Sequence, residues 1–371
     1  MADRREIETT NGPTFVLCIE NNAIRAQALL LCESIRRFCG RHRDAPILAI
    51  APRPGLGIDG ETIRRLDGMG VEYAEEPLNL VCPEYGSANR VFAAAWAEGR
   101  ARTEWVVVLD SDTVLLEELE LPAEADVAAR PVDVKGCATV GPGDPFEDYW
   151  TRLAGLHDVS LGCLPFIRTT VCNSRIRASY NGGLIAVRRE RGILSAWAEL
   201  FSRSVAAGLK PWRRSGLNVR ASTGLVGRAA SEYWGSNQAA AALAIWSRTR
   251  RVVHFPETCN VPLHLLVDQP ELRARARRAP LVHVHYHWLF AECHQAALAA
   301  LRDMGLAPSR LEWLAARLPL PVRRPLSGRT RGSWGDASAG HGAAASDGAA
   351  AASTDEGSRA AAWPASAPGS R

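Results

Sequence analysis

The feature that most constrains this chain is an apolar run at residues 105–109 that ends directly in two carboxylates, Asp110 and Asp112. Consecutive apolar residues of this length are typical of a strand buried on both faces, as in the centre of a parallel sheet. Carboxylates are tolerated where such a strand ends, and open α/β sheets bind their ligands at this carboxyl end. We therefore expect Asp110 and Asp112 to face a ligand site.

The spacing of the two carboxylates predicts a metal site. Only the small Ser111 separates them, so both can converge on one divalent cation. Hard oxygen ligands suit Mg²⁺ or Mn²⁺ that is shared with a phosphorylated substrate. A simpler interpretation, a helix-capping aspartate beside a solvated one, is also compatible with an isolated Asp-x-Asp sequence.

Length and composition limit the class of protein. The 371 residues, with 47% hydrophobic content, are enough to bury a substantial core. The net charge of +4 is too small to indicate nucleic-acid binding, so we expect no nucleic-acid partner. The nine cysteines form no Cys-x-x-Cys pair, which favours buried thiols in a reducing compartment. Without a signal-peptide pattern or a long apolar stretch, the chain is expected to be soluble and cytoplasmic, with no transmembrane segment.

Strand and helix patterns alternate from the start of the chain. Apolar runs predict strands at 14–19, 47–51 and 71–73, and helical spacing predicts helices between them and at 90–97. This succession indicates parallel strands with right-handed crossovers, which is an α/β fold with a ligand crevice at the carboxyl ends. The turn after the first strand lacks a glycine-rich phosphate fingerprint, which argues against a dinucleotide-binding fold or a P-loop.

The rest of the chain continues this pattern as far as a change in composition. Residues 131–180 are rich in Pro, Gly and Cys, as in long functional loops. After Pro325 almost no large apolar residues remain, which predicts a disordered low-complexity tail. We expect one domain at 12–322 and the tail at 325–371. The further predicted elements are strands at 184–187, 252–255 and 281–284 and helices at 193–205, 238–246 and near 296 and 311.

Four short motifs follow one another along these elements. They are Asp110-Ser111-Asp112 at a strand end, Tyr180-Asn181-Gly182-Gly183 before a strand, Ser236-Asn237-Gln238 opening a helix, and His285-Tyr286-His287 ending a strand. In this order they resemble nucleotide-sugar glycosyltransferases of the GT-A fold, and the type most similar is the glycogenin-like family of retaining enzymes. The likeness covers roughly residues 14–320.

The resemblance implies a fold and an activity. The fold would be a Rossmann-type, mostly parallel central sheet flanked by helices. The activity would be a hexosyltransferase-like transfer of sugar from a nucleotide-diphosphate sugar, the donor, to an acceptor. The acceptor, whether glycan, protein, lipid or small molecule, is not identified by the sequence.

The resemblance also implies a metal site. Asp110 and Asp112 would bind Mn²⁺ or Mg²⁺ that bridges the donor diphosphate, and His285 would be the third ligand, because it ends an apolar strand as the family's histidine does. Imidazole makes manganese the better fit. Strand alternation would point His283, His285 and His287 to the same side, so the choice among the three histidines stays open.

Further residues are assigned to the donor and to the chemistry. Asn181 would meet the donor sugar hydroxyls, Gln238 would lie near the reacting anomeric carbon, and Asn237 occupies the position of a family aspartate. Gly182 and Gly183 would permit close backbone approach or a positive φ, or simply a turn into the strand.

Polar residues at strand and helix ends are candidates for binding the nucleotide. For the asparagines and the arginine among them, plain capping is the alternative. These candidates are Asn21, Asn22, Asn89, Arg90 and Ser111.

Two other classes of function remain open. The family's Asp is Asn237 here, and the family's Lys-Pro-Trp segment after the histidine is absent, as expected of a catalytically degenerate transferase that survives as a binding scaffold. The Asp110-Ser111-Asp112 motif also resembles the first motif of haloacid dehalogenase phosphatases, with Asp110 as nucleophile and Asp112 as general acid. The later Gly143-Asp144 and Asp148 follow too closely for that family, and several β-α units precede Asp110, which argues against the phosphatase.

Overall fold

Seven strands form the central sheet of the computed structural model, which describes residues 10–157, 159–213, 219–276 and 280–321. Every neighbouring pair is parallel except the two pairs made by β9. The sheet is therefore mostly parallel, which confirms the predicted fold class. From one edge to the other its strands are β12 (Val252–His254), β6 (Val127–Pro131), β9 (Tyr180–Arg188), β4 (Thr103–Leu109), β1 (Thr10–Cys18), β2 (Ile47–Ala51) and β3 (Val71–Glu75).

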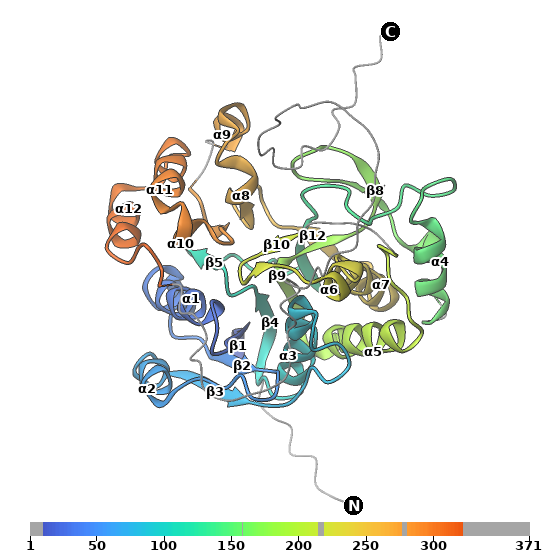
Figure 1. Ribbon diagram of the computed structural model, residues 1–371, viewed down its shortest axis with the longest axis horizontal. Helices are drawn as coiled ribbons and strands as arrows, with labels where there is room; N and C mark the ends of the chain where they lie inside the picture. The colour runs from blue at the N-terminus through green and yellow to red at the C-terminus, as the bar shows by residue number, and fades with distance from the viewer. Residues whose placement is uncertain (1–9, 158, 214–218, 277–279, 322–371) are drawn as a thin grey trace, which may run out of the picture. The chain divides into compact units, whose positions relative to one another are not determined.

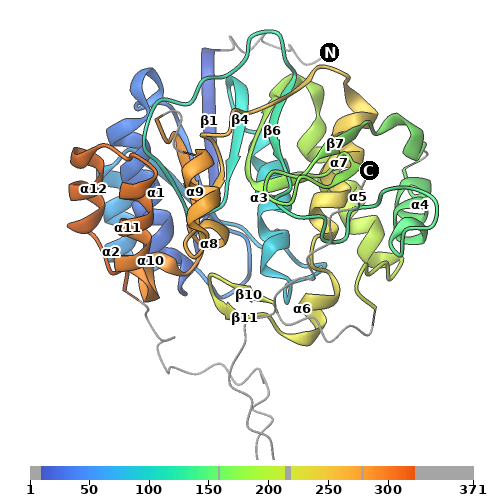
Figure 2. The ribbon, with the colours of Figure 1, turned by 90° about the horizontal axis from the view of Figure 1, so that it is seen from above.

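Helices cover both faces of the sheet, as Figures 1 and 2 show from two directions. Successive residues of β4 point to opposite faces. Val106 and Val108 pack in one apolar cluster, and Val107 and Leu109 pack in another. The helices that contribute to these clusters are α3 (Asn89–Glu98), α4 (Glu147–Gly155), α5 (Ile193–Ala206), α6 (Arg228–Glu232) and α7 (Ser236–Arg248) on the first face and α1 (Ile24–Phe38) and α2 (Gly60–Gly68) on the second.

A second, three-stranded sheet continues from the end of β4. Its strands are β13 (Val261–Pro262), β14 (His283–His285) and β5 (Thr113–Leu115), in that order. Strand β5 follows Asp112 directly and runs antiparallel to β14. The third apolar cluster joins this sheet to Leu30 of α1 and to the helices α8 (Leu263–Leu266), α10 (Leu289–Glu292), α11 (His294–Asp303) and α12 (Pro308–Ala315).

The remaining elements are short. They are the hairpin β7 (Phe166–Arg168) and β8 (Arg175–Arg177), the hairpin β10 (Arg220–Ala221) and β11 (Gly224–Leu225), the helix α9 (Pro270–Ala276), and the 3₁₀ turns η1 (Gly40–His42), η2 (Gly86–Ala88), η3 (Leu161–Cys163) and η4 (Arg189–Arg191). None of the helices in the described part of the chain is long and apolar enough to cross a membrane. The cysteines are free, and most are buried.

The structure corrects three sequence predictions. Strand β9 begins at Tyr180, so residues 180–183 belong to the strand and not to a turn before it. Helix α4 lies inside the segment 131–180, where the sequence predicts a long loop. Strand β14 begins at His283, two residues later than the predicted 281–284 run, and extends to His285. The predicted tail at 325–371 lies outside the described residues.

A buried carboxylate joins two of the helices on the first face. Helix α5 begins after Gly192 and has no side-chain cap of its own. Glu98, at the end of α3, accepts hydrogen bonds from the main-chain N–H of Leu194 (3.0 Å) and Ser195 (2.8 Å) and from the Ser195 hydroxyl (2.6 Å). A carboxylate is favourable at a helix N-terminus, where N–H groups lack partners. Glu98 therefore caps α5 from outside.

We expect Glu98→Ala to lower the free energy of unfolding by about 1–3 kcal/mol, because it leaves buried N–H groups without an acceptor. Urea unfolding followed by circular dichroism measures this change. The matched control is Glu199→Ala on the exposed side of α5, where Glu199 lies 3.9 Å from Arg203. That substitution should stay within about 0.5 kcal/mol of the parent. Equal loss in the two variants would contradict the capping role.

Candidate functional site

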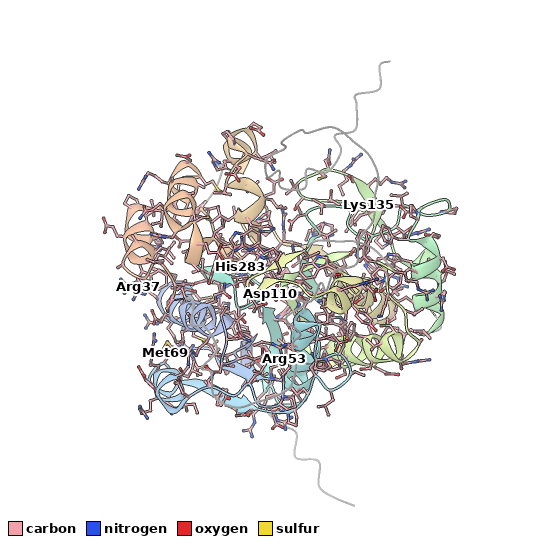
Figure 3. The ribbon with its side chains drawn as sticks, viewed as in Figure 1. Arg37, Arg53, Met69, Asp110, Lys135 and His283 are labelled. Carbon is pink, nitrogen blue, oxygen red and sulfur yellow. The ribbon has the colours of Figure 1, made fainter. Side chains whose placement is uncertain are left out.

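The two aspartates lie at the carboxyl end of the central strand, and β14 brings histidines to them. Figure 3 shows Asp110 at the end of β4. In the β5–β14 ladder His285 lies opposite Thr113, and the main-chain N–H of Tyr286 donates to the Asp112 carbonyl at 3.1 Å. This register places the His285 side chain beside both carboxylates.

The distances within this group are short. The Nε2 of His285 lies 3.2 Å from an oxygen of Asp112 and 3.8 Å from an oxygen of Asp110. The Nδ1 of His287 lies 3.5 Å from the second oxygen of Asp112. One ligand atom each from Asp112, His285 and His287 lies within 4.8 Å of the others. We call Asp112, His285 and His287 the Asp-His triad.

Charge and burial shift the pKa values of the two aspartates in opposite directions. Burial raises the pKa of Asp110, and the nearby Asp112 adds to this effect, so that the pKa stays above its ordinary value although Arg90 and His285 oppose the rise. Burial alone would also raise the pKa of Asp112. The positive charge on His285, with His287 and the Ser222 hydroxyl, instead brings the pKa of Asp112 well below its ordinary value.

The pKa values of the histidines are also shifted in different directions. Burial would lower the pKa of His285, but the carboxylates of Asp112 and Asp110 raise it above its ordinary value. Burial and the charge on His285 lower the pKa of His287 to about 3, and the same two causes lower that of His283 to about 3. His285 and His287 therefore lie against the same carboxylate, that of Asp112, with pKa values shifted in opposite directions.

Several ring nitrogens in this group lack hydrogen-bond partners among the described residues. They include Nδ1 of His285, both nitrogens of His283 and Nδ1 of His287, and all of these atoms are buried, whereas the Nε2 of His285 has Asp112 as its partner. A buried polar atom without a partner costs about 1–3 kcal/mol, and such groups often mark an ion site. A carboxylate and two imidazoles form a donor set that suits divalent transition ions. The residues present therefore fit a cation.

Arg90 is the cationic partner of Asp110. Its guanidinium forms an ion pair with that carboxylate, and both groups are largely buried. A Cβ on Gly182 would lie 2.7 Å from the Nη1 of Arg90. A Cβ on Gly183 would lie 2.8 Å from the Nδ1 of His285. The two glycines therefore leave room for Arg90 and His285, so of the alternatives open from the sequence the structure shows close approach within a strand, and neither a positive φ nor a turn.

Asn181 lies on the same strand, and its side chain is held by protein groups. Its amide donates to an oxygen of Asp133 at 2.6 Å, and its side-chain oxygen accepts from the Gly183 N–H at 2.9 Å. Asp133 also accepts a hydrogen bond from Thr170 at 2.6 Å. The Asn181 amide thus has a fixed orientation.

The nucleotide candidates are more engaged in internal contacts than the sequence suggests. Asn22 accepts from the Ile24 N–H at 2.9 Å and donates to Glu20 at 3.1 Å. Asn89 is buried and donates to Glu20 at 3.1 Å. Ser111 donates to the Cys18 carbonyl, and this bond ties the end of β4 to the end of β1. Asn21 is half-buried and its main-chain N–H donates to the Leu56 carbonyl.

The two residues at the start of α7 have different environments. Asn237 is 1% exposed, and its side-chain oxygen accepts from the Tyr85 hydroxyl and from the Gln238 N–H, both at 3.0 Å. Its amide donates to the Ser87 carbonyl at 3.2 Å. Gln238 is half-buried. Asn237 is therefore saturated with structural contacts, whereas Gln238 is the more accessible of the two.

Direct contacts thus join some of the predicted residues and not others. Arg90 forms an ion pair with Asp110, and His285 lies beside both Asp110 and Asp112. Gly183 lies against His285, so closely that an added Cβ would meet the imidazole ring. The side chains of Asn22, Asn89 and Ser111 bond elsewhere.

Sequence reasoning missed two partners of these residues. Ser222, in the turn between β10 and β11, donates to Asp112, and nothing in its sequence context signals this contact. Asp133 follows the carboxyl end of β6, and the rule that selected Asp110 could have found it.

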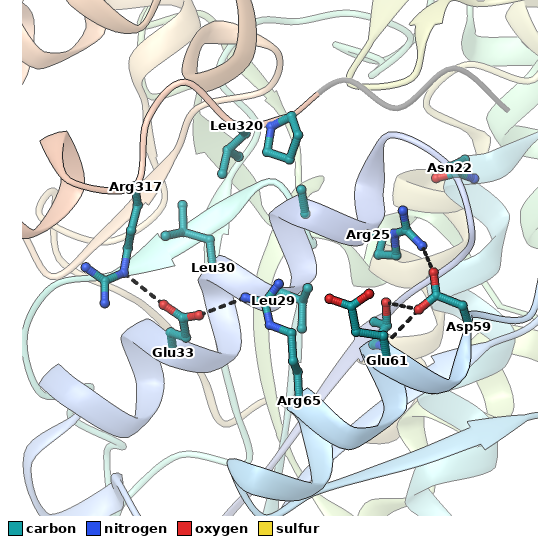
Figure 4. A pocket seen from close by; sticks show the side chains of 13 residues that line it. Asn22, Arg25, Leu29, Leu30, Glu33, Asp59, Glu61, Arg65, Arg317 and Leu320 are labelled. Carbon is teal, nitrogen blue, oxygen red and sulfur yellow. Dashed lines mark hydrogen bonds and ion pairs between the residues drawn. The ribbon is translucent and has the colours of Figure 1, made fainter. Parts of the chain in front are cut away.

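A separate cavity of about 190 Å³ lies against α1 and α2 (Figure 4). Its lining includes Asn22 but neither the aspartates of β4 nor the histidines. Its arginines all pair with carboxylates: Arg25 with Asp59, and both Arg65 and Arg317 with Glu33. Glu61 adds a further negative charge to the lining, so no arginine is left over for a phosphate and this cavity is not the candidate site.

Comparisons with solved structures show distant likenesses. Mouse xyloside xylosyltransferase 1 in its apo form has 8% identity and a TM-score of 0.38, over 74% of this chain and 97% of that one. The galactosyltransferase LgtC in complex with donor and acceptor sugar analogs has 12% identity and a TM-score of 0.41, over 82% and 100%. The glycosyltransferase GlyE of Streptococcus pneumoniae has the same identity and score, over 85% and 66%. No curated protein matches the chain.

A family model of a glycosyltransferase domain matches residues 15–209, more than half of the chain. The matched segment contains Asp110, Asp112 and Asn181, while Gln238 and the histidines of β14 lie beyond it. The match confirms the glycosyltransferase class that the motifs predict, and the glycogenin-like type stays a prediction. The chain belongs to the Rhodobacterales glycosyltransferase domain family.

Proposed function

We propose that this glycosyltransferase depends on a divalent cation and moves a sugar from a nucleotide-diphosphate sugar to an acceptor. The observation that carries the proposal is the group of Asp110, Asp112 and His285 at the carboxyl end of β4, with ring nitrogens that lack partners within the described residues. Sheets of this kind bind ligands at that end. The retaining outcome and a hexose donor rest on the resemblance alone.

Asp112 and His285 would hold the cation, with Asp110 beside them, and the imidazole favours Mn²⁺ over Mg²⁺. When bound, a divalent cation supplies positive charge to the diphosphate as the glycosidic bond breaks. Arg90 offers a second fixed positive charge next to Asp110. Arg90 is therefore our candidate for the positive charge that the absent Lys-Pro-Trp segment would have brought to the diphosphate.

The remaining residues would position the donor sugar. Asp133 fixes the amide of Asn181, which would meet the sugar hydroxyls. Asn237 would act by positioning Gln238, because its side-chain oxygen accepts a hydrogen bond from the main-chain N–H of Gln238. Asn21 is the nucleotide candidate whose side chain has no hydrogen bond among those of the described residues, whereas Asn22, Asn89 and Ser111 would shape the pocket around it. Holding the reactants in one geometry supplies much of the remaining rate enhancement.

The phosphatase alternative has weaker support. Asp110 follows the fourth strand of the chain, not the first. Asp144, which imitates the later phosphatase motif, forms an ion pair with Lys135 and accepts from the Phe146 N–H. Asp148 is exposed and lies 4.0 Å from Arg152 on α4. These contacts are those of a surface helix start.

We expect Asp112→Asn to reduce cation-dependent turnover of nucleotide sugars by roughly 10² to 10³, because the variant loses a charged oxygen that would hold the cation. Release of nucleoside diphosphate from a panel of nucleotide sugars, with and without Mn²⁺, measures this loss. Asp148→Asn, an exposed carboxylate on α4, is the matched control and should keep parental activity.

Three outcomes separate the alternatives. Full activity of the parent in excess chelator would sink the metal-dependent proposal. Absence of turnover, with nucleotide sugars raising the melting temperature, would indicate the binding scaffold, since a ligand at 100 times its Kd adds roughly 2.7 kcal/mol. Phosphatase activity that is lost in Asp110→Asn would indicate the phosphatase.

The affinity for Mn²⁺ should depend on pH through His285. Only the neutral imidazole binds a cation, and the neighbouring carboxylates raise the pKa of His285 above its ordinary value of about 6.5. Affinity should therefore begin to fall at a higher pH than for an ordinary histidine, by about tenfold per pH unit if one proton is displaced. His287 is already neutral there, because its pKa is about 3.

Calorimetric titration of metal-free protein with Mn²⁺ at a series of pH values tests this dependence. His285→Asn should weaken binding and flatten the pH profile, while His294→Asn, at the half-buried first residue of α11, should leave the profile unchanged. An affinity of the parent that stays constant as the pH falls through neutrality would show that His285 is not a ligand.

A further inference from the structure

His287 has an unusual backbone for its residue type. Its φ is +52°, in the left-handed region that non-glycine residues seldom adopt. The side-chain amide of Gln27, on α1, donates to the His287 carbonyl at 2.9 Å and fixes this conformation. Strained backbone that its surroundings hold in place is a feature of functional sites.

The strained backbone directs the His287 ring toward Asp112. The ring stacks on that of His285, with centroids 4.3 Å apart and planes 9° apart. His264, on α8, packs edge-on against it at 3.8 Å, and the Trp288 ring lies at 5.7 Å. Packing from these sides leaves the Nδ1 of His287 buried, 3.5 Å from Asp112 and without a hydrogen-bond partner among the described residues.

The carboxylate of Asp110 has a different partner from that of Asp112. It forms an ion pair with the buried guanidinium of Arg90, and it is not among the three residues whose ligand atoms lie within 4.8 Å of one another. Two ligands of one ion with bonds of about 2.0–2.2 Å can be about 4.4 Å apart, so the Asp-His triad needs only a small contraction to bind.

We infer that His287 is a ligand of the cation, and that the ligand set is one carboxylate and two imidazoles, from Asp112, His285 and His287, with Asp110 held outside it by Arg90. This inference rests on the proposed cation-dependent function and specifies its metal site. It departs from the ligand set that the sequence predicts, in which Asp110 and Asp112 bind with a single histidine.

The two ligand sets differ in their selectivity for ions. Imidazole suits Co²⁺, Zn²⁺ and similar ions, whereas Mg²⁺ prefers an all-oxygen environment. A site with two imidazoles should bind Co²⁺ much more tightly than Mg²⁺, and removing one imidazole should affect Co²⁺ more than Mg²⁺. Two nitrogen ligands and one oxygen ligand would still leave positions open for phosphate oxygens.

The test is calorimetric titration of the metal-free protein with Co²⁺ and, separately, with Mg²⁺. The informative variant is His287→Asn, because asparagine tolerates a positive φ and the fold should be kept. We expect its Co²⁺ affinity to fall at least about tenfold, the loss found even for residues that only support a metal ligand. Its Mg²⁺ affinity should change less, and the visible absorption bands of bound Co²⁺ should shift.

Two controls complete the design. Asp110→Asn should keep the parental ratio of Co²⁺ to Mg²⁺ affinity, because it removes no nitrogen ligand. The variant His294→Asn, at a half-buried histidine that begins α11, should bind both ions as the parent does. The melting temperature without metal checks that each variant is folded.

The outcomes separate this inference from the proposed function. Co²⁺ affinity of His287→Asn within about twofold of the parent, equal weakening of both ions, or a parent that binds neither ion would overturn the inference. Nucleotide-sugar turnover is scored separately. If the parent shows turnover in Mn²⁺ and His287→Asn binds Co²⁺ as the parent does, only the inference is contradicted. If His287→Asn selectively loses Co²⁺ affinity but the parent shows no turnover, only the proposed function is contradicted.

Discussion

The pairing of β5 with β14 is the interaction on which the site depends. It joins the segment directly after Asp112 to a strand far along the chain and sets His285 opposite Thr113. Because side chains alternate along a strand, a slip of one residue would turn His285 away from the carboxylates. The N–H of Tyr286, bonded to the Asp112 carbonyl, extends the contact by one residue past β14 and so pins the register next to the site.

Bringing two carboxylates into a buried place requires compensating charge. Arg90 supplies it for Asp110, and His285 supplies it for Asp112. Both partners approach closely because β9 carries Gly182 and Gly183 at the points of contact. A buried ion pair gains little net stability, since desolvation offsets attraction. The arrangement is therefore better explained by a ligand that the group receives than by a contribution to folding.

The sequence predicts local features of this fold well and distant contacts poorly. The apolar run of β4 and the carboxylates after it are visible because burial and strand ends leave a local pattern. Alternation predicts that three histidines share one side, but β14 ends at His285. The orientation of the His287 ring then depends on its left-handed backbone, which a strand pattern in the sequence does not predict. The glycines of β9 look like a turn because their neighbours, Arg90 and His285, are remote in sequence.

The site is assembled from two parts of the chain that pack in different apolar clusters. The carboxylates end a strand of the main sheet, while His285 and His287 belong to the segment that packs with α8, α10 and α11. Ring nitrogens that lack partners cost stability in the free protein, and a ligand that satisfies them returns that free energy on binding. A cation shared by the two parts would therefore stabilise the contact between them as well as bind the donor. Cation binding and the packing of the two parts would then be thermodynamically linked.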